Sequence, residues 1–585
     1  MLLLTRTLSS YKTLPFLYSV KHKFGMTTST FIPLRTTRTN RIAIPDEMKI
    51  ELTETEEKIC ILLDKCRKHL QEVKEIHTEC RIAGGWVRDK LLGSQSNDID
   101  IALTDMMGYA FAEHLAEFAQ GEGMEVGSIG KIAQNPDQSK HLETATLRVL
   151  GKDIDLVNLR SEEYASGSRI PTGVIFGTPE QDALRRDITI NALFYNCHTR
   201  SVEDWTKKSL DDLRNGIVRT PLSPKETFID DPLRVLRCIR FASRFGFDIV
   251  PEIEKAVRDP GIKEALVSKV ARERAGEELS KMVKGQDPLR SIQLITSLNI
   301  YSSLFAGIPT DIVKTFSVHP SSEGDAMKAA CILQTLLTPE DSSLPCVHPM
   351  MLKAVEDDAT CKPRLFLGAF LTPFLGITYR DRKEKEYPVV EYVIRECLKL
   401  GSQNHFLNGI PALFSACKLL KNPDLNDKRF KNPSERVAIG LLLREKVVHN
   451  VHTGSHWTSS LLFSLVQDLV HLCEDVTRGV RADQAVKVIE VYNTFVEQVE
   501  ALGLHDMVDA KPLLDGNEVC SAFGASRGRW TGAALASVLS WQLENPQGTK
   551  EECLTWLKGE HQQGNLEVDD VKSDSGPANK KARTK

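Results

Sequence analysis

The chain has 585 residues, of which 41% are hydrophobic and 26% are charged, and its net charge at pH 7 is −4. This length leaves room for two to four domains, and the composition is that of an ordinary soluble protein. No apolar run is long enough to span a bilayer, and the 13 cysteines form no CxxC pair or other zinc spacing, so neither a membrane span nor a zinc site is expected.

The first 45 residues differ in composition from the rest of the chain. No acidic residue precedes Asp46, and serine and threonine are abundant. The basic residues of this stretch are Arg6, Lys12, Lys21, Lys23, Arg35, Arg38 and Arg41. Such a composition predicts an organellar targeting leader over residues 1–45, for the mitochondrion or a plastid, and the alternative is a disordered basic leader. Met26 lies inside it, and a form that starts there is expected in the cytoplasm and nucleus.

Residues 46–79 are expected to form an N-terminal helix, and the segment 81–92 then predicts a strand, a tight turn and a second helix. Gly84 and Gly85 occupy the turn, where glycine adopts backbone angles that other residues avoid. The N–H groups at a helix start and the charged fork of Arg88 suit a triphosphate. The alternative is an ordinary strand-to-helix turn.

Asp98 and Asp100 follow this turn on a predicted strand. Alternate side chains of a strand share a face, so the two carboxylates point the same way while the neighbouring isoleucines face the core. Carboxylates at this separation can share divalent cations, and Mg²⁺ takes oxygen ligands and binds substrate phosphates. Asp155, in a predicted pair of strands over residues 147–159, is expected beside them. Its alternative role is to solvate an edge strand.

A helix is predicted from Leu233 onward, because apolar residues recur on one side of it. Arginines recur on the other side every three or four residues: Arg234, Arg237, Arg240 and Arg244. An arginine stripe is most often a solvated face with ion-pair partners. Four like charges on one face repel each other, however, which favours an anion such as a triphosphate or an RNA backbone.

Five sequence blocks follow one another between about residues 80 and 280. They lie at residues 84–89 with 98–100, 185–193, 210–216, 230–237 and, more loosely, 268–274. In this combination the chain resembles the nucleotidyltransferases of the DNA polymerase β superfamily, and among them the class II tRNA nucleotidyltransferases, or CCA-adding enzymes, of the eukaryotic type. Trp86 and Asp230 depart from the commonest residues without removing a functional group. No site residue is carried over from the fifth block.

The resemblance implies an α+β fold, with a small N-terminal sheet domain followed by a long, mainly helical neck, body and tail. The expected boundaries are a catalytic head over 80–200, a neck with the nucleotide-selecting helix over 201–290, a helical body and tail that binds tRNA over 291–565, and a disordered basic tail over 566–585. Helical apolar spacing predicts helices at 252–257, 271–283, 288–298, 389–400, 436–448, 459–474 and 483–502.

The resemblance also implies how a base is selected without a nucleic-acid template. Asp231 and Arg234 match the residues that contact the base. Cytosine and adenine each present an amine donor beside a ring-nitrogen acceptor, which a carboxylate and a guanidinium complement, whereas uracil and guanine present the reverse pattern. The expected nucleotide-binding residues are Gly85, Arg88, Arg186, Asp231, Arg234, Arg237 and Arg240.

The implied function is the template-independent addition of the 3′-terminal CCA to tRNA from CTP and ATP, with release of pyrophosphate. Asp98, Asp100 and Asp155 are the expected catalytic residues, and the first two are expected to bind Mg²⁺. The partners are the tRNA 3′ end, CTP and ATP, and neither a membrane nor a protein partner is expected. Because the net charge is −4, affinity for RNA must come from local basic surface. The alternatives are a poly(A) polymerase of the same superfamily and a non-catalytic RNA-binding scaffold.

Overall fold

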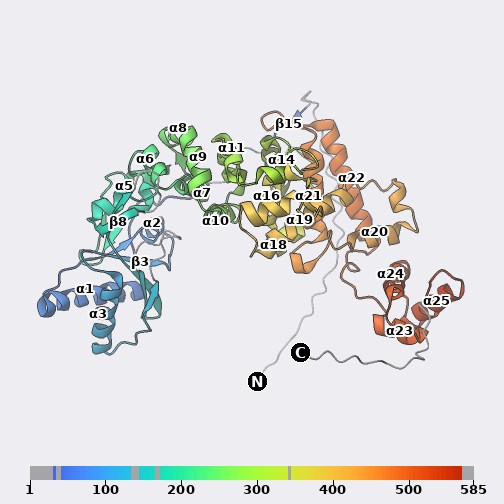
Figure 1. Ribbon diagram of the computed structural model, residues 1–585, viewed down its shortest axis with the longest axis horizontal. Helices are drawn as coiled ribbons and strands as arrows, with labels where there is room; N and C mark the ends of the chain where they lie inside the picture. The colour runs from blue at the N-terminus through green and yellow to red at the C-terminus, as the bar shows by residue number, and fades with distance from the viewer. Residues whose placement is uncertain (1–30, 35–40, 133–143, 165–170, 340–343, 569–585) are drawn as a thin grey trace, which may run out of the picture.

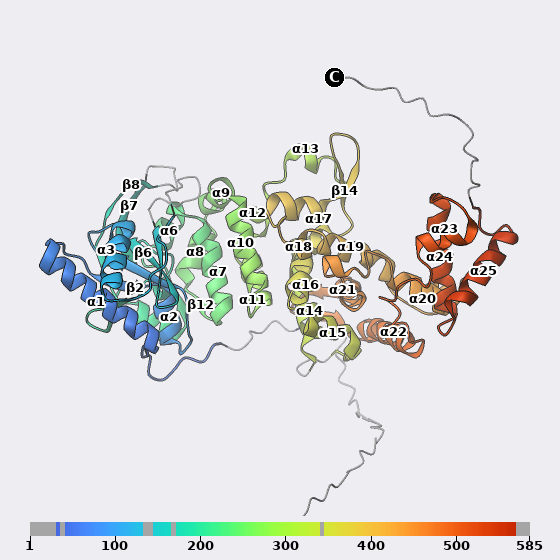
Figure 2. The same ribbon diagram turned by 90° about the horizontal axis from the view of Figure 1, so that it is seen from below.

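The computed structural model describes residues 31–34, 41–132, 144–164, 171–339 and 344–568. It has the α+β architecture expected from the sequence, and the molecule is elongated (Figure 1). A sheet domain occupies one end, a long run of helices follows, and a small group of helices occupies the other end, as the perpendicular view also shows (Figure 2). Within the described residues, no helix combines the length and the apolar character that crossing a membrane requires.

The head is built on a seven-stranded sheet with the strand order β10-β9-β2-β3-β6-β5-β4. Its strands are β2 (Cys80–Ala83), β3 (Ile99–Leu103), β4 (Gly130–Ile132), β5 (Thr144–Val149), β6 (Lys152–Asn158), β9 (Phe194–Asn196) and β10 (Ser201–Glu203). Neighbouring strands are antiparallel except for β3 and β6, which run parallel. The sheet therefore continues to Glu203, slightly beyond the expected head boundary at residue 200. A separate hairpin joins β7 (Arg160–Tyr164) and β8 (Pro171–Phe176).

Two helices, α1 (Glu54–Lys74) and α3 (Gly108–Gly121), cover one face of this sheet. Helix α1 lies within the range 46–79 and begins with a capping box between Thr53 and Glu56. Glu56 also accepts hydrogen bonds from Trp86 (3.1 Å) and Lys90 (2.7 Å) of α2 (Gly85–Leu91). The opposite face of the sheet has a small cluster of buried alanines with Leu159 and Phe194, next to α4 (Pro179–Leu184), and it is left open for the site.

The neck begins with a short parallel strand pair and continues as helices. Its elements are α5 (Ser209–Asn215), β11 (Ile217–Val218), α6 (Pro224–Asp230), α7 (Leu233–Phe245), β12 (Asp248–Ile249), α8 (Pro251–Val257), α9 (Pro260–Lys269), α10 (Arg272–Val283) and α11 (Pro288–Ser297). Helix α7 packs against α10 and α11 through its apolar side. In both views α7 and α10 lie between the head sheet and the helices of the body (Figures 1 and 2).

The body is a packed set of helices around α21 (Trp457–Val470), whose side chains are buried nearly all round. The other body helices are α12 (Tyr301–Phe305), α13 (Thr310–Val313), α14 (Glu323–Leu337), α15 (Pro349–Asp357), α16 (Cys361–Phe370), α17 (Val389–Tyr392), α18 (Asn404–Leu407), α19 (Gly409–Leu420), α20 (Glu435–Leu443) and α22 (Ala482–Ala501). A small hairpin joins β13 (Thr378–Arg380) and β14 (Glu386–Pro388). The helix predicted over 389–400 is instead α17 followed by a π-helical turn, and the one predicted over 459–474 ends at Val470.

Part of the expected leader is folded onto the body and the neck. Strand β1 (Phe31–Ile32) pairs with β16 (Gly479–Arg481), which also pairs with β15 (Cys473–Asp475). Leu34 is buried in the main core, and the N–H of Ile42 donates to the carbonyl of Phe245 at the end of α7 (3.2 Å). The leader expected over 1–45 therefore includes residues that contact the mature fold. Residues 1–30, like residues 569–585 of the expected basic tail, lie outside the described part of the chain.

Three C-terminal helices, α23 (Gly516–Phe523), α24 (Arg529–Glu544) and α25 (Lys550–Gln562), share a hydrophobic cluster separate from the main core. They dock on the body through α24, which packs against α20. Arg436 of α20 donates across this contact to the backbone carbonyl of Leu543, and within the body to that of Leu502 at the end of α22. The C-terminal end is thus a small unit with its own core.

Candidate active site

The three predicted carboxylates meet on the open face of the head sheet. Asp98 precedes β3, Asp100 lies within it, and Asp155 of β6 is the register partner of Asp100 in the parallel pair. The isoleucines on either side of Asp100 are buried on the opposite face, as the alternation predicts. Asp98 is exposed, and Asp100 and Asp155 are half-buried. The hydroxyl of Thr146 donates to Asp155 (2.6 Å).

The electrostatics of Asp100 indicate a site that accepts a cation. Burial, and then the negative charges of Asp98 and Asp155, raise the pKa of Asp100 to about 6, while Arg186 opposes this shift. Clustered carboxylates of this kind are relieved by a divalent cation, for which oxygen donors are the preferred ligands. Among the described residues, no group of three or more histidine, cysteine, aspartate or glutamate side chains is placed so that it could hold a metal ion by itself. The carboxylates of Asp98 and Asp100 are oxygen donors of the kind that a divalent cation takes.

Because Gly84 has no side chain, it leaves room for the guanidinium of Arg186 beside this site. Gly84 has a positive φ of 72°, and a Cβ atom there would lie only 2.8 Å from Nη1 of Arg186. Arg186 donates to the buried carboxylate of Asp182 (2.9 Å) and to the carbonyl of Asn191 (3.1 Å), and it lies over the ring of Phe194. Although burial opposes ionisation, the nearby arginines hold the pKa of Asp182 below its usual value. Arg186 is thus a fixed positive charge near Asp100.

Arg88 lies deeper than a phosphate ligand would be expected to lie. Its side chain is only 4% exposed and is paired with Asp89 (2.7 Å). The guanidinium lies over the rings of Phe241 and Phe245 and also donates to Asn191. Burial lowers its pKa. In this conformation Arg88 joins α2 to α7, and it can contact a phosphate only if these contacts rearrange. The half-buried Gly85 lies next to it at the start of α2.

The arginine stripe of α7 is present, and three of its four arginines pair with carboxylates of the protein. Arg237 pairs with Asp187 (2.7 Å) and Arg240 with Glu278 of α10 (2.5 Å). The other arginines of the stripe also have partners: Arg244 lies 3.6 Å from Asp89, and Arg234 donates to the carbonyl of Arg185 at 2.6 Å. Three of the four arginines thus have carboxylate partners, and binding of an external anion by the stripe stays a prediction. The alternative, a face with ion-pair partners, describes the structure without a ligand.

A hydrogen-bond network joins Arg186, whose charge acts on Asp100, to the arginines of α7. Arg186, whose charge acts on Asp100, donates to the backbone of Asn191. The side-chain amide of Asn191 donates to Asp187, which pairs with Arg237. Asp187 is buried, yet Arg237 and Asn191 hold its pKa below its usual value. The two halves of the predicted site, more than a hundred residues apart in sequence, are therefore brought together.

Sequence reasoning left several residues of this network without a role. Asp187 and Asn191 lie in the second block, where their polar character in an otherwise apolar run was the available signal. The segment from Thr189 is a 3-10 turn before β9, and this turn directs Asn191 towards the site. Arg274, in the fifth block, pairs with the predicted base-selecting residue Asp231 (2.7 Å). No periodicity in the sequence indicates that pair.

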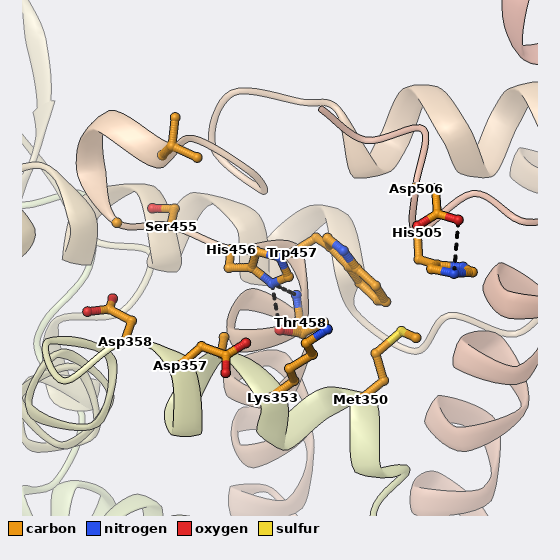
Figure 3. A pocket seen from close by; sticks show the side chains of 13 residues that line it. Met350, Lys353, Asp357, Asp358, Ser455, His456, Trp457, Thr458, His505 and Asp506 are labelled. Atoms are coloured by element: carbon orange, nitrogen blue, oxygen red, sulfur yellow. Dashed lines mark hydrogen bonds and ion pairs between the residues drawn. The ribbon is translucent and has the colours of Figure 1, made fainter. Parts of the chain in front are cut away.

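A separate hollow of about 360 Å³ lies in the body (Figure 3). Side chains of α15, of the start of α21 and of the loop after α22 line it, and none of the predicted site residues is among them. In Figure 3 the His456 ring is turned towards Thr458, to which it is hydrogen-bonded (2.7 Å), while His505 contacts only Asp506 among the residues drawn. Burial lowers the pKa of His456 to about 4.

The fold and the site together define a nucleotidyltransferase. Residues 80–219 match the family model described as the Poly A polymerase head domain. The chain is 36% identical over 544 residues to the mitochondrial CCA tRNA nucleotidyltransferase of Saccharomyces cerevisiae, covering 89% of this chain and 96% of that one. It is 35% identical over 533 residues to the mitochondrial CCA tRNA nucleotidyltransferase of Candida glabrata, covering 87% and 96%. The chain belongs to the CCA tRNA nucleotidyltransferase family.

The fold agrees with this assignment along most of the chain. The Thermotoga maritima CCA-adding enzyme, solved in complex with tRNA, superposes with a TM-score of 0.53 and 19% identity, covering 86% of this chain and 96% of that one. At this level of identity the similarity concerns the fold. The two chains therefore share a fold along most of their length.

Proposed function

We propose that the protein adds the 3′-terminal CCA to tRNA, using CTP and ATP and releasing pyrophosphate. The relatives named above support this function because they match nearly the whole chain. The observation that carries it is the set of contacts from Arg186, whose charge acts on Asp100 of the carboxylate cluster, through Asn191 and Asp187 to Arg237 of α7. One side supplies a cation site and the other a polar face of fixed geometry, as nucleotidyl transfer requires.

The carboxylates hold the metal, which we assign as Mg²⁺ with Asp98 and Asp100 as its ligands. When bound, Mg²⁺ supplies charge stabilisation to the attacking and leaving oxygens. Asp155 completes the acidic face, and its hydrogen bond from Thr146 fixes its orientation. Arg186, held by Asp182, presents a positive charge to the triphosphate beside the same carboxylates.

The base is selected by Asp231 and Arg234 at the start of α7. The carboxylate accepts from an exocyclic amine, and the guanidinium donates to a ring nitrogen, so cytosine and adenine fit. Uracil and guanine would leave charged groups without a partner, which costs enough to reject them. Arg237 and Arg240 lie on the same face of the helix, and while they stay paired with Asp187 and Glu278 they donate their remaining N–H groups to the nucleotide's phosphates. Gly85 leaves space at the turn.

The mitochondrial names of the relatives support a mitochondrial location for the long form. We further propose that a form starting at Met26 lies in the cytoplasm and nucleus, because it lacks most of the basic leader. Fluorescence microscopy of the long form and of the Met26 form, each fused to the same reporter, tests this. The same distribution for both forms would contradict it.

An extension assay on tRNA that lacks its 3′ end tests the function. The protein is incubated with each nucleotide singly and with all four together, and we expect C and A to be added in limited number. Asp98→Asn and Asp100→Asn should each abolish addition of both nucleotides while tRNA binding persists. The control is Asp211→Asn, an exposed carboxylate of α5. Extension by either metal-site variant would refute the assignment of the carboxylates.

The same assay separates a second candidate, poly(A) polymerase, which the name of the matched head family favours. A poly(A) polymerase would ignore CTP and build long A tails on any accessible 3′ end. A chain that binds tRNA without extending it would instead be a scaffold. Addition of C before A excludes both.

A further inference from the structure

The carboxylate of Asp231 accepts hydrogen bonds from a side chain of the neighbouring helix α10. Arg274, in the first turn of α10, donates through Nη2 to one oxygen of Asp231 (2.7 Å) and through Nη1 to the other (3.4 Å). The N–H of Leu233 donates to Asp231 as well (3.2 Å). Both side chains of the pair remain partly exposed, Asp231 at 20% and Arg274 at 27%, so the contact lies at the edge of the site.

Helix α10 is itself fixed in place. A Cβ atom on Gly276 would overlap the carbonyl oxygen of Leu398, so the helix lies directly against the body at this point. Arg272 donates to carbonyls at the end of α12, and Glu278 pairs with Arg240 of α7. Arg274 and Glu278 are one turn apart, so α10 presents a cation to the start of α7 and an anion to its middle. The position of Arg274 is therefore determined by contacts along the whole helix.

We infer that Arg274 is a specificity-determining residue that positions Asp231 for base selection. This inference rests on the proposed function. A guanidinium that contacts both oxygens of a carboxylate fixes the plane of that group, which a single donor does not. The carboxylate keeps lone pairs free for an exocyclic amine, since it offers about four acceptor sites. Arg234, the other base-selecting residue, is fixed separately by the carbonyl of Arg185.

Without Arg274, the Asp231 side chain would be free to rotate and would not hold one edge towards the base. The rejection of uracil and guanine depends on an acceptor that faces their own carbonyl acceptor, so rejection weakens when the acceptor turns away. Binding of the triphosphate depends on other residues and is expected to change little. Loss of Arg274 should therefore reduce the discrimination of CTP and ATP from UTP and GTP more than it reduces nucleotide binding.

The test is nucleotide selectivity of the full chain on tRNA lacking its 3′ end. For Arg274→Gln we expect the ratio of kcat/KM for CTP over UTP to fall about tenfold, the effect of misaligning one charge-assisted hydrogen bond. Arg274→Lys keeps the charge but cannot donate to both carboxylate oxygens from one planar group. Its CTP over UTP ratio should therefore lie between those of the wild type and Arg274→Gln. If Arg274→Gln fails to fold by thermal unfolding, Arg274→Lys provides the measurement. The control is Lys281→Gln, on the exposed side of the same helix.

A double-mutant cycle with Asp231→Asn shows whether Arg274 acts through Asp231. In the Asp231→Asn background, Arg274→Gln should change the selectivity ratio no further. Equal losses of kcat/KM for all four nucleotides, or an additive effect in the double variant, would overturn the inference. Failure of the wild-type chain to add C and A would instead contradict the proposed function, so the two results are distinguishable.

Discussion

Asp100 is a carboxyl group whose pKa is raised to about 6 by burial and by the charges of Asp98 and Asp155. Its unfolded-state pKa is near the usual value of 3.8, so between pH 3.8 and about 6 the folded state holds a proton that the unfolded state has released. Stability without metal therefore falls as the pH rises from about 4 to 6 and stays reduced above that. The repulsion between ionised Asp100 and its neighbours Asp98 and Asp155, which lowers stability, is also what a bound cation would relieve.

We predict that Asp100→Asn raises the stability of the metal-free protein at pH 8 by up to about 3 kcal/mol, the scale of a shift of this size. At pH 4 the two proteins should be nearly equal, because wild-type Asp100 is then protonated. Thermal unfolding in the presence of chelator at both pH values measures this. Added Mg²⁺ should stabilise the wild type at pH 8 and leave the variant almost unchanged; equal stabilisation of both would contradict the role of Asp100.

At the scale of elements, strand β1 joins the N-terminal segment to the body. Gly479 has a φ of 89°, and a Cβ atom there would overlap the carbonyl oxygen of Ile32, so the two strands approach more closely than any side chain allows. Arg41 lies against Gly216 and Gly246, the residues that end α5 and α7, in the same way. The segment therefore contacts the body at one point and the neck at another.

We predict that removal of residues 1–30 leaves the melting temperature nearly unchanged, because every described contact of the segment is retained. Removal of residues 1–45 should lower it by several degrees, since β1, the buried Leu34 and the Ile42 hydrogen bond are lost. Thermal unfolding of the two truncated chains gives the comparison. Processing in an organelle should correspondingly occur before Phe31, and N-terminal sequencing of the mature chain that placed cleavage after residue 45 would argue against this.

At the scale of the whole molecule, the sheet domain with the candidate site and the C-terminal helices lie at opposite ends (Figure 2). The unit formed by α23, α24 and α25 has its own core, and α24 attaches it to the body. Leu543 of α24 lies against Gly440, where an added Cβ would come within 2.6 Å of it. A unit of this kind can be removed without opening the site in the head.

We predict that a chain ending at residue 512 keeps its affinity for CTP and ATP but has a KM for tRNA raised about tenfold. Affinity for RNA is the sum of many backbone contacts over a long surface, whereas the nucleotide is held in the head and neck. Steady-state extension kinetics, with tRNA and nucleotide varied separately, check this. A loss of nucleotide affinity with tRNA binding intact would contradict the division of roles.

The sequence by itself determined the features that depend on neighbouring residues. Alternation along one strand placed Asp98 and Asp100 on a single face, and helical spacing placed the arginines of α7 on another. The turn at Gly84 could be predicted too, because it depends only on the residues next to it in the sequence. The order of the five blocks, not any periodicity, led to the family.

The tertiary structure decided which charged groups meet. Asp155 pairs in register with Asp100, Arg237 finds Asp187, and Arg274 reaches Asp231 from a helix 43 residues further along the chain. The basic composition before Asp46 could not reveal that Phe31 and Ile32 form a strand, because their partner β16 lies in the last quarter of the chain. Local patterns fix the face on which a side chain lies, and only the packing of distant elements fixes what it contacts.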